Sequence, residues 1–367
     1  MFGNVYSGKR VLITGHTGFK GTWLTSWLLE LGADVCGISN SIPTSPAMFE
    51  VLELESKIEH NIEDIRNLPS IKKIVHDFKP DFLFHLAAQA IVSTSYSDPL
   101  DTISTNVMGT ANVLETLRTL ENDCNAVIIT SDKCYENVEW VWGYKETDPV
   151  GGRDIYSGSK GAAEVIFHAY QQSFFAKTDG NIKMATGRAG NVIGGGDWAA
   201  DRIVADCMRA WSKSERVEIR CPDATRPWQH VLEPLSGYLA LGQGLFENPN
   251  KNHGQQYNFG PRSEQNHTVK DLLSDLSKHW KFNSSDEAYL ITDNIPFHEA
   301  GLLKLNCDKA LFNLKWEANL NYSECIKFVS KWYFEFYQGK SNMLEMTRNQ
   351  IGAYQNYAKE KNLAWCN

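Results

Sequence analysis

The sequence predicts an α/β protein with a Rossmann-type, doubly wound parallel sheet and a smaller C-terminal substrate-binding domain. Two observations carry this prediction. Short β-branched runs alternate with helical patterns through the first half of the chain, and a glycine-rich turn joins the first strand to the first helix. Strands alternating with helices of this length imply crossover connections and a parallel sheet with helices on both faces.

The predicted elements follow in order. Runs rich in Val, Ile and Leu predict strands over residues 10–14, 33–39, 81–88, 125–131 and 182–194. Helical periodicity predicts helices between them, over residues 19–32, 68–80, 98–121 and 156–175. The stretch "QQYNFGP", residues 255–261, is expected to return one more strand to the main sheet.

The domain organisation is expected to change near residue 190, where Gly-rich and Trp-containing loops replace the regular alternation. We expect a cofactor-binding Rossmann domain over 1–190, with a returning segment near 229–260. The smaller domain would comprise 191–228 and 261–367. The 367 residues are enough for one large domain or two modest ones, and no flexible linker separates the two parts.

The composition argues against several classes of protein. A formal net charge of −8 argues against nucleic acid and anionic membranes as partners. No apolar run approaches the roughly 20 residues of a membrane span, and the N-terminus lacks a signal-peptide layout. The eight cysteines are scattered without a C-x-x-C pair, which indicates reduced cytoplasmic thiols and neither disulfides nor a metal site.

The first strand–helix junction predicts a dinucleotide site. Its sequence, "TGHTGFKG", contains glycines spaced G-x-x-G-x-x-G, and we expect the cofactor to contact Gly15, Thr17, Gly18, Phe19 and Gly21. Glycines allow the backbone to turn tightly and to approach a pyrophosphate closely, and the helix N-terminus offers free N–H groups.

The end of the second strand bears on the choice of cofactor. The run "GISNSIPT" offers Ser39 and Asn40, but no acidic residue for a ribose diol and no lysine or arginine for a 2′-phosphate. NAD is therefore favoured over NADP.

Two further motifs supply candidate catalytic residues. Tyr156 and Lys160 stand at i, i+4 and so share one helix face, while Ser131, Asp132 and Lys133 follow the strand "AVIIT". Together with the glycine loop, they resemble the extended short-chain dehydrogenase/reductase superfamily. The resemblance implies that Tyr156 removes a hydroxyl proton while hydride passes to NAD. It implies that Lys160 lowers the tyrosine pKa and holds the nicotinamide ribose.

The same resemblance extends the expected cofactor site to residues from three other segments. Asp64 and Ile65 in "EDIRN" would meet the adenine, and Asn106 lies in the long helix. The run "HLAAQ" would line the cofactor with Leu86, Ala87, Ala88 and Gln89.

Within this superfamily, a Ser/Thr–Asp–X triad at this strand end is typical of sugar-nucleotide 4,6-dehydratases. The segments "GHTGFKGTWL", "SDKCYEN" and "RPWQHVLEPLSGYL" are similar to the CDP-glucose 4,6-dehydratases, and the resemblance covers nearly the full chain. It implies oxidation at C4, loss of water across C5–C6 and return of hydride to C6, in deoxysugar biosynthesis for lipopolysaccharide O-antigen. The cytidine assignment depends on this resemblance alone.

The resemblance also implies roles for the triad. Ser131 would hydrogen-bond the C4 oxygen, Asp132 would protonate the leaving C6 hydroxyl, and Lys133 would take the C5 proton. An alternative for Lys133 is a structural ion pair with Asp132 or Glu136. A hexose 4-epimerase would need Tyr156 and Lys160 but neither member of the Asp–Lys pair. A non-catalytic cofactor sensor would tend to lose the tyrosine or the lysine.

The substrate diphosphate needs cationic or amide donors. Arg226 matches the arginine that grips the diphosphate in related dehydratases, and Arg202 and Asn191 are further candidates. The chain departs from its relatives at Ile155, where proline is common, and at Ser93, where arginine is expected.

Association is expected through two helices, those carrying Asn106 and Tyr156. In relatives they pack against their copies in a homodimer, with a tetramer as the larger alternative. The apolar positions of these helices would equally serve an internal core.

Overall fold

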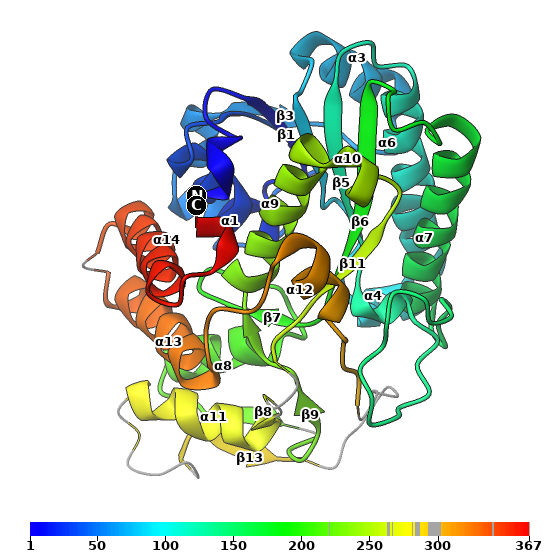
Figure 1. Ribbon diagram of the computed structural model, residues 1–367. Helices are drawn as coiled ribbons and strands as arrows, with labels where there is room; N and C mark the ends of the chain where they lie inside the picture. The colour runs from blue at the N-terminus through cyan, green and yellow to red at the C-terminus, as the bar shows by residue number, and fades with distance from the viewer. Residues whose placement is uncertain are drawn as a thin grey trace.

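A seven-stranded parallel sheet forms the centre of the molecule, in the order β11-β6-β5-β4-β1-β2-β3 (Figure 1). The computed structural model describes residues 1–219, 221–262, 265, 267–280, 282, 287–292, 302–339 and 341–366. The strands are β1 Arg10–Thr14, β2 Asp34–Ser39, β3 Glu59–Ile62, β4 Phe82–His85, β5 Cys124–Ile129, β6 Ile182–Ala189 and β11 Gln256–Phe259. The predicted fold class is confirmed.

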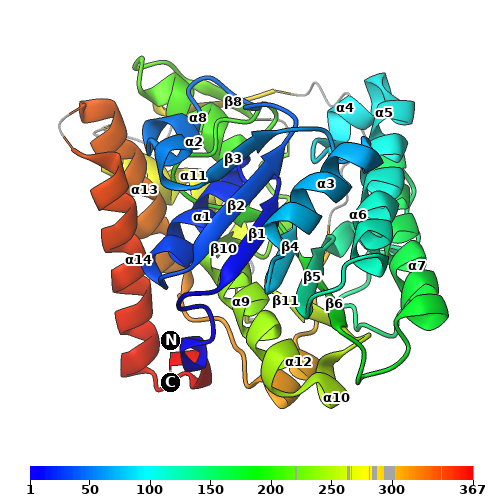
Figure 2. The ribbon, with the colours of Figure 1, turned by 90° about the horizontal axis from the view of Figure 1, so that it is seen from above.

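Helices cover both faces of this sheet (Figure 2). One face packs against α3 (Leu68–Phe78), α6 (Gly109–Arg118) and α7 (Ile155–Phe174). The other packs against α1 (Phe19–Glu30) and α9 (Leu232–Glu247). Neighbouring residues of one strand therefore enter different cores: Leu12 of β1 joins the first, and Val11 and Ile13 join the second. Burial on both faces explains why these strands read as continuous apolar runs.

Three elements differ from the predicted ones. Strand β3 was not predicted because its sequence, "EHNI", is polar and lies at the sheet edge. The helix predicted over 98–121 is divided into α5 (Pro99–Ile103), a π-helical turn over Ser104–Met108, and α6. The strand predicted over 182–194 ends as β6 at Ala189. A separate strand, β7 (Val192–Ile193), pairs in parallel with β10 (Gln229–His230).

The remainder of the chain forms small strand pairs and helices. Parallel β8 (Val217–Ile219) and β13 (Tyr289–Ile291) make one pair, and antiparallel β9 (Thr225–Arg226) and β12 (His267–Thr268) make another. The helices are α8 Ile203–Trp211, α11 Val269–Ser277, α12 Asp308–Leu314, α13 Tyr322–Gln338 and α14 Met343–Glu360, with shorter α2 Met48–Val51, α4 Val92–Ser97 and α10 Pro249–Asn252. No helix in the described part of the chain is both long and apolar enough to cross a membrane.

The C-terminal segment returns to the start of the chain. Helix α14 packs against α1, and the Trp365 ring stacks on Phe2 with ring centroids 5.2 Å apart. The two termini consequently lie side by side (Figure 1). The last helix is thus part of the covering of the Rossmann sheet, so the predicted boundary at residue 261 separates segments that pack together. That boundary stays a prediction.

A buried carboxylate, Glu233 of α9, joins this C-terminal segment to the sheet covering. It accepts hydrogen bonds from the backbone N–H groups of Asn319 (2.8 Å) and Leu320 (2.6 Å), and from the Tyr354 hydroxyl of α14 (2.9 Å). Burial raises the pKa of Glu233 from its usual 4.5 to about 7, although the three hydrogen bonds oppose this shift.

This shift predicts a pH-dependent stability. The folded protein keeps the Glu233 proton where the unfolded chain releases it, so the contribution of Glu233 to the free energy of unfolding falls as pH rises from 4.5 to about 7. Glu233→Gln does not titrate. Between pH 5 and 8 its stability should rise relative to wild type by about 2–3 kcal/mol, measured by urea unfolding. A difference that does not vary with pH would contradict the assignment.

Candidate active site

The glycine loop has the geometry of a phosphate-binding turn. Gly15 has a φ of +80°, and a Cβ there would lie 2.7 Å from the Ala87 nitrogen. A Cβ at Gly21 would lie 2.0 Å from the Gly15 carbonyl oxygen. Only glycine fits at these two positions. Helix α1 starts after Gly18 without a side-chain cap, so its first N–H groups remain open to an anion.

Ser39, at the end of β2, forms hydrogen bonds within the protein. The Ser39 hydroxyl lies 3.0 Å from His16 Nδ1 and accepts a hydrogen bond from the Thr17 N–H (3.3 Å), while Asn40 is exposed. His16 in turn lies against His60 of β3, with 2.6 Å between Nε2 and Nδ1. Ser39 therefore stabilises the glycine loop through its contacts with His16 and Thr17.

The residues predicted to meet the adenine are also engaged within the protein. The Asp64 carboxylate pairs with Arg66, with 2.6 Å between Oδ2 and Nη2, and this hydrogen bond lowers the pKa of Asp64. Arg66 was not singled out from the sequence, and it also pairs with Asp101. The Ile65 side chain is buried in the core formed with α3 and α6. Its role toward a cofactor stays a prediction.

Asn106, in the π-helical turn, fixes the strand end that was predicted to line the cofactor. Its Oδ1 accepts from the Gln89 N–H (2.8 Å), and its Nδ2 donates to the Gln89 carbonyl (3.0 Å) and to Ser159 Oγ of α7 (2.9 Å). One amide thus links the segment carrying Leu86, Ala87 and Ala88 to the helix carrying Tyr156. π-Helical turns are often found at functional sites.

The five candidate catalytic residues come from two neighbouring elements. Ser131 follows β5, and its hydroxyl donates to Asp132 Oδ1 (2.9 Å) and accepts from the Lys133 N–H (3.2 Å). Tyr156 and Lys160 lie buried on the first turns of α7. That helix is capped by Asp154, which accepts from the Ser157 N–H at 2.9 Å.

Burial shifts the pKa values of three residues in this cluster. It raises the pKa of Asp132, against the charges of Lys133 and Lys20 and the Ser131 hydrogen bond. It lowers the pKa of Lys160 to about 8. It also raises the pKa of Tyr156 to about 12, although Arg202 and a hydrogen bond with Ser131 act in the opposite direction. The cluster therefore contains a carboxyl whose pKa is raised and a tyrosine that needs further positive charge before it can act as a base.

Lys20 is a cation that the sequence analysis passed over, although it stands inside the "GFKG" motif. Its charge lowers the pKa of Asp132, and its own pKa is lowered to about 8 by burial and by Arg202. For Lys133, no ion pair with Asp132 or Glu136 occurs in the described parts of the chain. The charge of Lys133 nevertheless lowers the pKa of Asp132, so both interpretations of Lys133 stay predictions.

The three predicted substrate-binding residues lie at different distances from the cluster. Asn191 follows Gly190, where a Cβ would lie 2.9 Å from Asp132 Oδ2. The charge of Arg202 acts on Tyr156, and Ser93 hydrogen-bonds Asp201 beside it. Arg226 lies on β9, one residue from Pro227, which lines the pocket beside Asp132.

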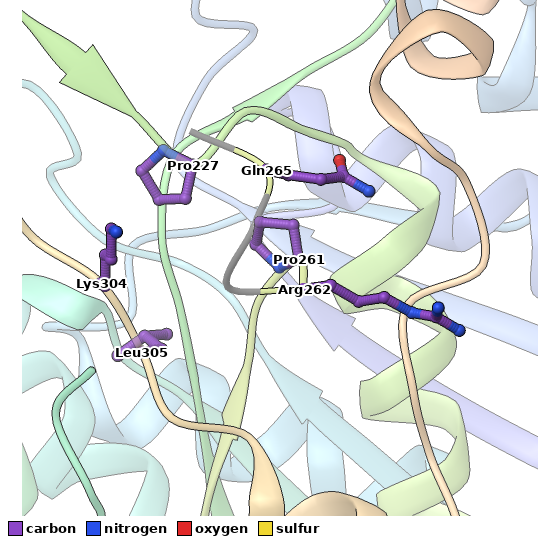
Figure 3. Close-up of a pocket in the computed structure, with 6 residues that line it drawn as sticks. All are labelled: Pro227, Pro261, Arg262, Gln265, Lys304 and Leu305. Carbon is purple, nitrogen blue, oxygen red and sulfur yellow. The ribbon is translucent and has the colours of Figure 1, made fainter. Parts of the chain in front are cut away.

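That pocket lies between the end of the sheet and the C-terminal segment. Its lining residues are Asp132, Gly190, Pro227, Gln229, Gly260, Pro261, Leu303 and Leu305. A second pocket shares Pro227, Pro261 and Leu305 with it and adds Arg262, Gln265 and Lys304 (Figure 3). Sequence reasoning missed Gln229, Leu303 and Leu305 because nothing local marks residues that meet Asp132 only after folding.

A buried polar network connects the elements that carry the candidate catalytic residues. Arg188 of β6 pairs with Glu164 of α7 at 2.8 Å, and both side chains are at least 96% buried. Thr130, next to Ser131, donates to Glu164, and Arg188 donates to the Tyr135 hydroxyl at 2.8 Å. The network therefore ties together the end of β5, the helix α7 and strand β6.

Breaking this pair should destabilise the protein strongly. Glu164→Gln leaves the Arg188 guanidinium buried without a counter-charge, and we expect a loss of about 3–5 kcal/mol in the free energy of unfolding. Glu164→Gln combined with Arg188→Met should recover part of that loss, measured by urea unfolding. The control is Glu115→Gln, which removes an exposed pair with Arg118 and should cost about 0–1 kcal/mol. Equal losses from the two single variants would contradict this view.

Comparisons with known proteins agree with this geometry. The family model described as GDP-mannose 4,6 dehydratase matches residues 12–329. A protein of Salmonella typhimurium named CDP-glucose 4,6-dehydratase is 44% identical over 354 residues, covering 96% of this chain and 97% of its own.

Two solved structures show the same fold. DesIV, a dTDP-glucose 4,6-dehydratase from Streptomyces venezuelae solved with NAD, has a TM-score of 0.76 at 17% identity, covering 91% of this chain and 99% of its own. UDP-glucose 4-epimerase from Thermotoga maritima has a TM-score of 0.76 at 21% identity, covering 90% and 99%. The family match and the 44% identical relative show that the chain belongs to the GDP-mannose 4,6 dehydratase family of the extended short-chain dehydrogenases/reductases.

Proposed function

We propose that this protein is an NAD-dependent nucleotide-sugar 4,6-dehydratase that converts CDP-glucose to CDP-4-keto-6-deoxyglucose. The observation that carries the proposal is the buried Asp132 carboxyl, whose pKa is raised by burial and whose charge acts on Tyr156. A 4-epimerase oxidises and reduces C4 only and has no use for an acid at this position. The 44% identical relative named for CDP-glucose supports the choice of nucleotide.

The residues present fit NAD. The close approach at Gly15 and Gly21 and the uncapped start of α1 suit a diphosphate, and the predicted contacts surround that turn. When bound, NAD would take a hydride from C4 of the sugar and later return it to C6.

The side chains of this protein would move the protons. Tyr156 accepts the C4 hydroxyl proton, helped by the charges of Lys160 and Arg202. Lys133 takes the C5 proton, which the C4 ketone makes acidic. Asp132 gives its proton to the C6 oxygen, and water leaves.

Proton balance assigns a further role to Ser131. Each turnover adds one proton to Tyr156 and removes one from Asp132, because the C5 proton returns to C5. The Ser131 hydroxyl donates to Asp132 and also hydrogen-bonds Tyr156. It is therefore positioned to pass the proton from the tyrosine to the carboxylate and so restore the starting state.

Arg226, Arg202 and Asn191 would hold the substrate diphosphate, since Asn191 and Arg202 flank the cluster and Arg226 adjoins the pocket. The larger Rossmann part, 1–190 with 229–260, would carry the cofactor, and 191–228 with 261–367 would carry most of the nucleotide contacts. All eight cysteines are free thiols, which supports a cytoplasmic location.

The reaction can be followed by NMR in deuterated water. Wild type with NAD and CDP-glucose should form a 4-keto-6-deoxy sugar carrying deuterium at C5, and the UDP, TDP and GDP sugars should turn over poorly. Tyr156→Phe should abolish turnover while NAD binding survives. Lys133→Met should reduce both C5 exchange and product formation.

Three other outcomes would each contradict one part of the proposal. Epimerised product without C5 deuterium would overturn the dehydratase proposal. Turnover of another nucleotide sugar alone would overturn the cytidine assignment. Full C5 exchange in Lys133→Met would remove the lysine from the base role.

We further propose a homodimer through the outer surface of α5–α7. That surface exposes Leu100, Met108 and Val165, each more than half exposed. Val165→Glu should convert the dimer into a monomer in light scattering coupled to size-exclusion chromatography. The matched control is Phe312→Glu on α12, also a large exposed apolar residue, which should leave the dimer intact. A wild-type monomer would contradict the proposal, and a wild-type tetramer would extend it.

A further inference from the structure

A buried histidine at the end of β4, His85, has no role in the proton transfers proposed above. It is the register partner of Thr14, which ends β1 directly before the glycine loop. Two residues earlier, Leu12 and Leu83 of the same strands enter the core formed with α3, α6 and α7, so Thr14 and His85 face that helix layer. His85 also directly precedes the run 86–89 that was predicted to line the cofactor. It therefore lies beside the cofactor-binding turn.

Hydrogen bonds join the His85 ring to both of its neighbours. Its Nδ1 lies 2.7 Å from the Thr14 hydroxyl, and its Nε2 lies 3.0 Å from the hydroxyl of Thr110 on α6. Thr110 donates its one hydroxyl hydrogen to the Asn106 carbonyl (2.7 Å), so it can only accept from His85, and Nε2 carries the ring hydrogen. Nδ1 then accepts from Thr14, whose oxygen in turn accepts from the Ala87 N–H (3.2 Å).

Burial keeps the direction of these hydrogen bonds fixed. It lowers the pKa of His85 from its usual 6.5 to about 3, and the charge of Lys160 acts in the same direction. The ring therefore stays neutral near neutral pH, with one donor and one acceptor, and both are in use.

The chain of hydrogen bonds continues from Asn106 into α7. Asn106 Nδ2 donates to the Ser159 hydroxyl (2.9 Å), which donates to the backbone carbonyl of Tyr156 (2.7 Å). The side chains that form this chain are each at most 4% exposed: Thr14, His85, Thr110, Asn106 and Ser159. A buried polar group that loses its partner is costly, so each bond of the chain constrains the next.

We propose that His85 is a positioning residue that holds the NAD-binding turn and Tyr156 at a fixed separation. It does so through the hydrogen-bond chain that starts at Thr14 and ends at the backbone of Tyr156. The proposal rests on the dehydratase function above, in which a hydride and a proton leave the same C4 position, one to NAD and the other to Tyr156. A misplacement of about 1 Å between reacting groups can cost about 100-fold in rate.

Replacing the histidine ring tests this role. His85→Phe keeps a planar ring and removes both nitrogens. We expect it to lower kcat about 10-fold or more, measured with NAD and CDP-glucose both saturating, because the tyrosine is no longer held against the turn. The Kd for NAD should change less than about 3-fold, since the glycine turn itself is intact.

The matched control is His253→Phe. His253 is also buried and bridges two backbone groups, since its Nδ1 accepts from the Met184 N–H (3.0 Å) and its Nε2 contacts the Phe175 carbonyl. Both variants should lower the urea midpoint, but only His85→Phe should lower kcat of the folded protein. An unchanged kcat in His85→Phe, or an equal loss in both variants, would overturn the positioning role. If His85→Phe does not fold, Thr110→Val keeps the side-chain shape, removes the hydroxyl and should show the same selective loss.

Ser159→Ala breaks the chain at its other end. If both residues act through one chain, the variant that combines it with His85→Phe should lose no more kcat than the larger single loss, to within about 2-fold. Losses that multiply would show two independent effects and overturn the chain.

Nitrogen-15 NMR of histidine-labelled protein tests the chain without substrate. The signals absent from His85→Phe should report a protonated Nε2 and a bare Nδ1, unchanged between pH 5 and 8 because the pKa of His85 is about 3. A protonated Nδ1, or titration within that range, would overturn the chain. No turnover of any nucleotide sugar by wild type would instead overturn the proposed function, and the positioning role with it.

Discussion

The buried ion pair between Glu164 and Arg188 is the interaction on which the arrangement of the candidate site depends. It joins α7, which carries Tyr156 and Lys160, to β6, and through Thr130 to the end of β5, which carries Asp132. A buried ion pair is weak evidence for net stability, because desolvation offsets most of its attraction. Its value here is geometric. With both charges fully paired, any displacement of α7 against β5 would leave a buried charge without a partner.

The same low exposure gives the candidate residues their chemical character. Burial disfavours charge, so it moves the pKa of Asp132 upward and that of Lys160 downward. A carboxyl with a raised pKa and a lysine with a lowered pKa suit proton transfer near neutral pH. Tyr156 is the exception, because burial raises its pKa to about 12. Positive charge must offset that effect. Arg202 already acts in this direction, and a bound oxidised nicotinamide would add to it.

Segments far apart in the chain complete the site. Gly190 lies against Asp132, while Gln229 and Pro261 precede and follow the returning strand β11. Leu303 and Leu305 come from the C-terminal segment. Glu233 ties the following stretch, at Asn319 and Leu320, to α9. The pocket wall beside Asp132, the candidate acid, thus depends on how the last third of the chain packs against the helices that cover the sheet.

The sequence alone predicted a doubly wound parallel sheet, most of its elements and the candidate catalytic residues, because these predictions depend on local patterns. Alternating apolar runs, a glycine triplet at a strand–helix junction and the i, i+4 spacing of Tyr156 and Lys160 are all readable within a few residues. Strand β3 and the π-helical turn at Asn106 were not readable, since a polar edge strand and one extra residue in a helix leave no periodic signal. Only the tertiary structure decided that the charge of Lys20 acts on Asp132, that burial raises the pKa of Tyr156, and that Gln229 lines the pocket. Desolvation and long-range contacts arise when distant segments meet, and no local pattern records where they will meet.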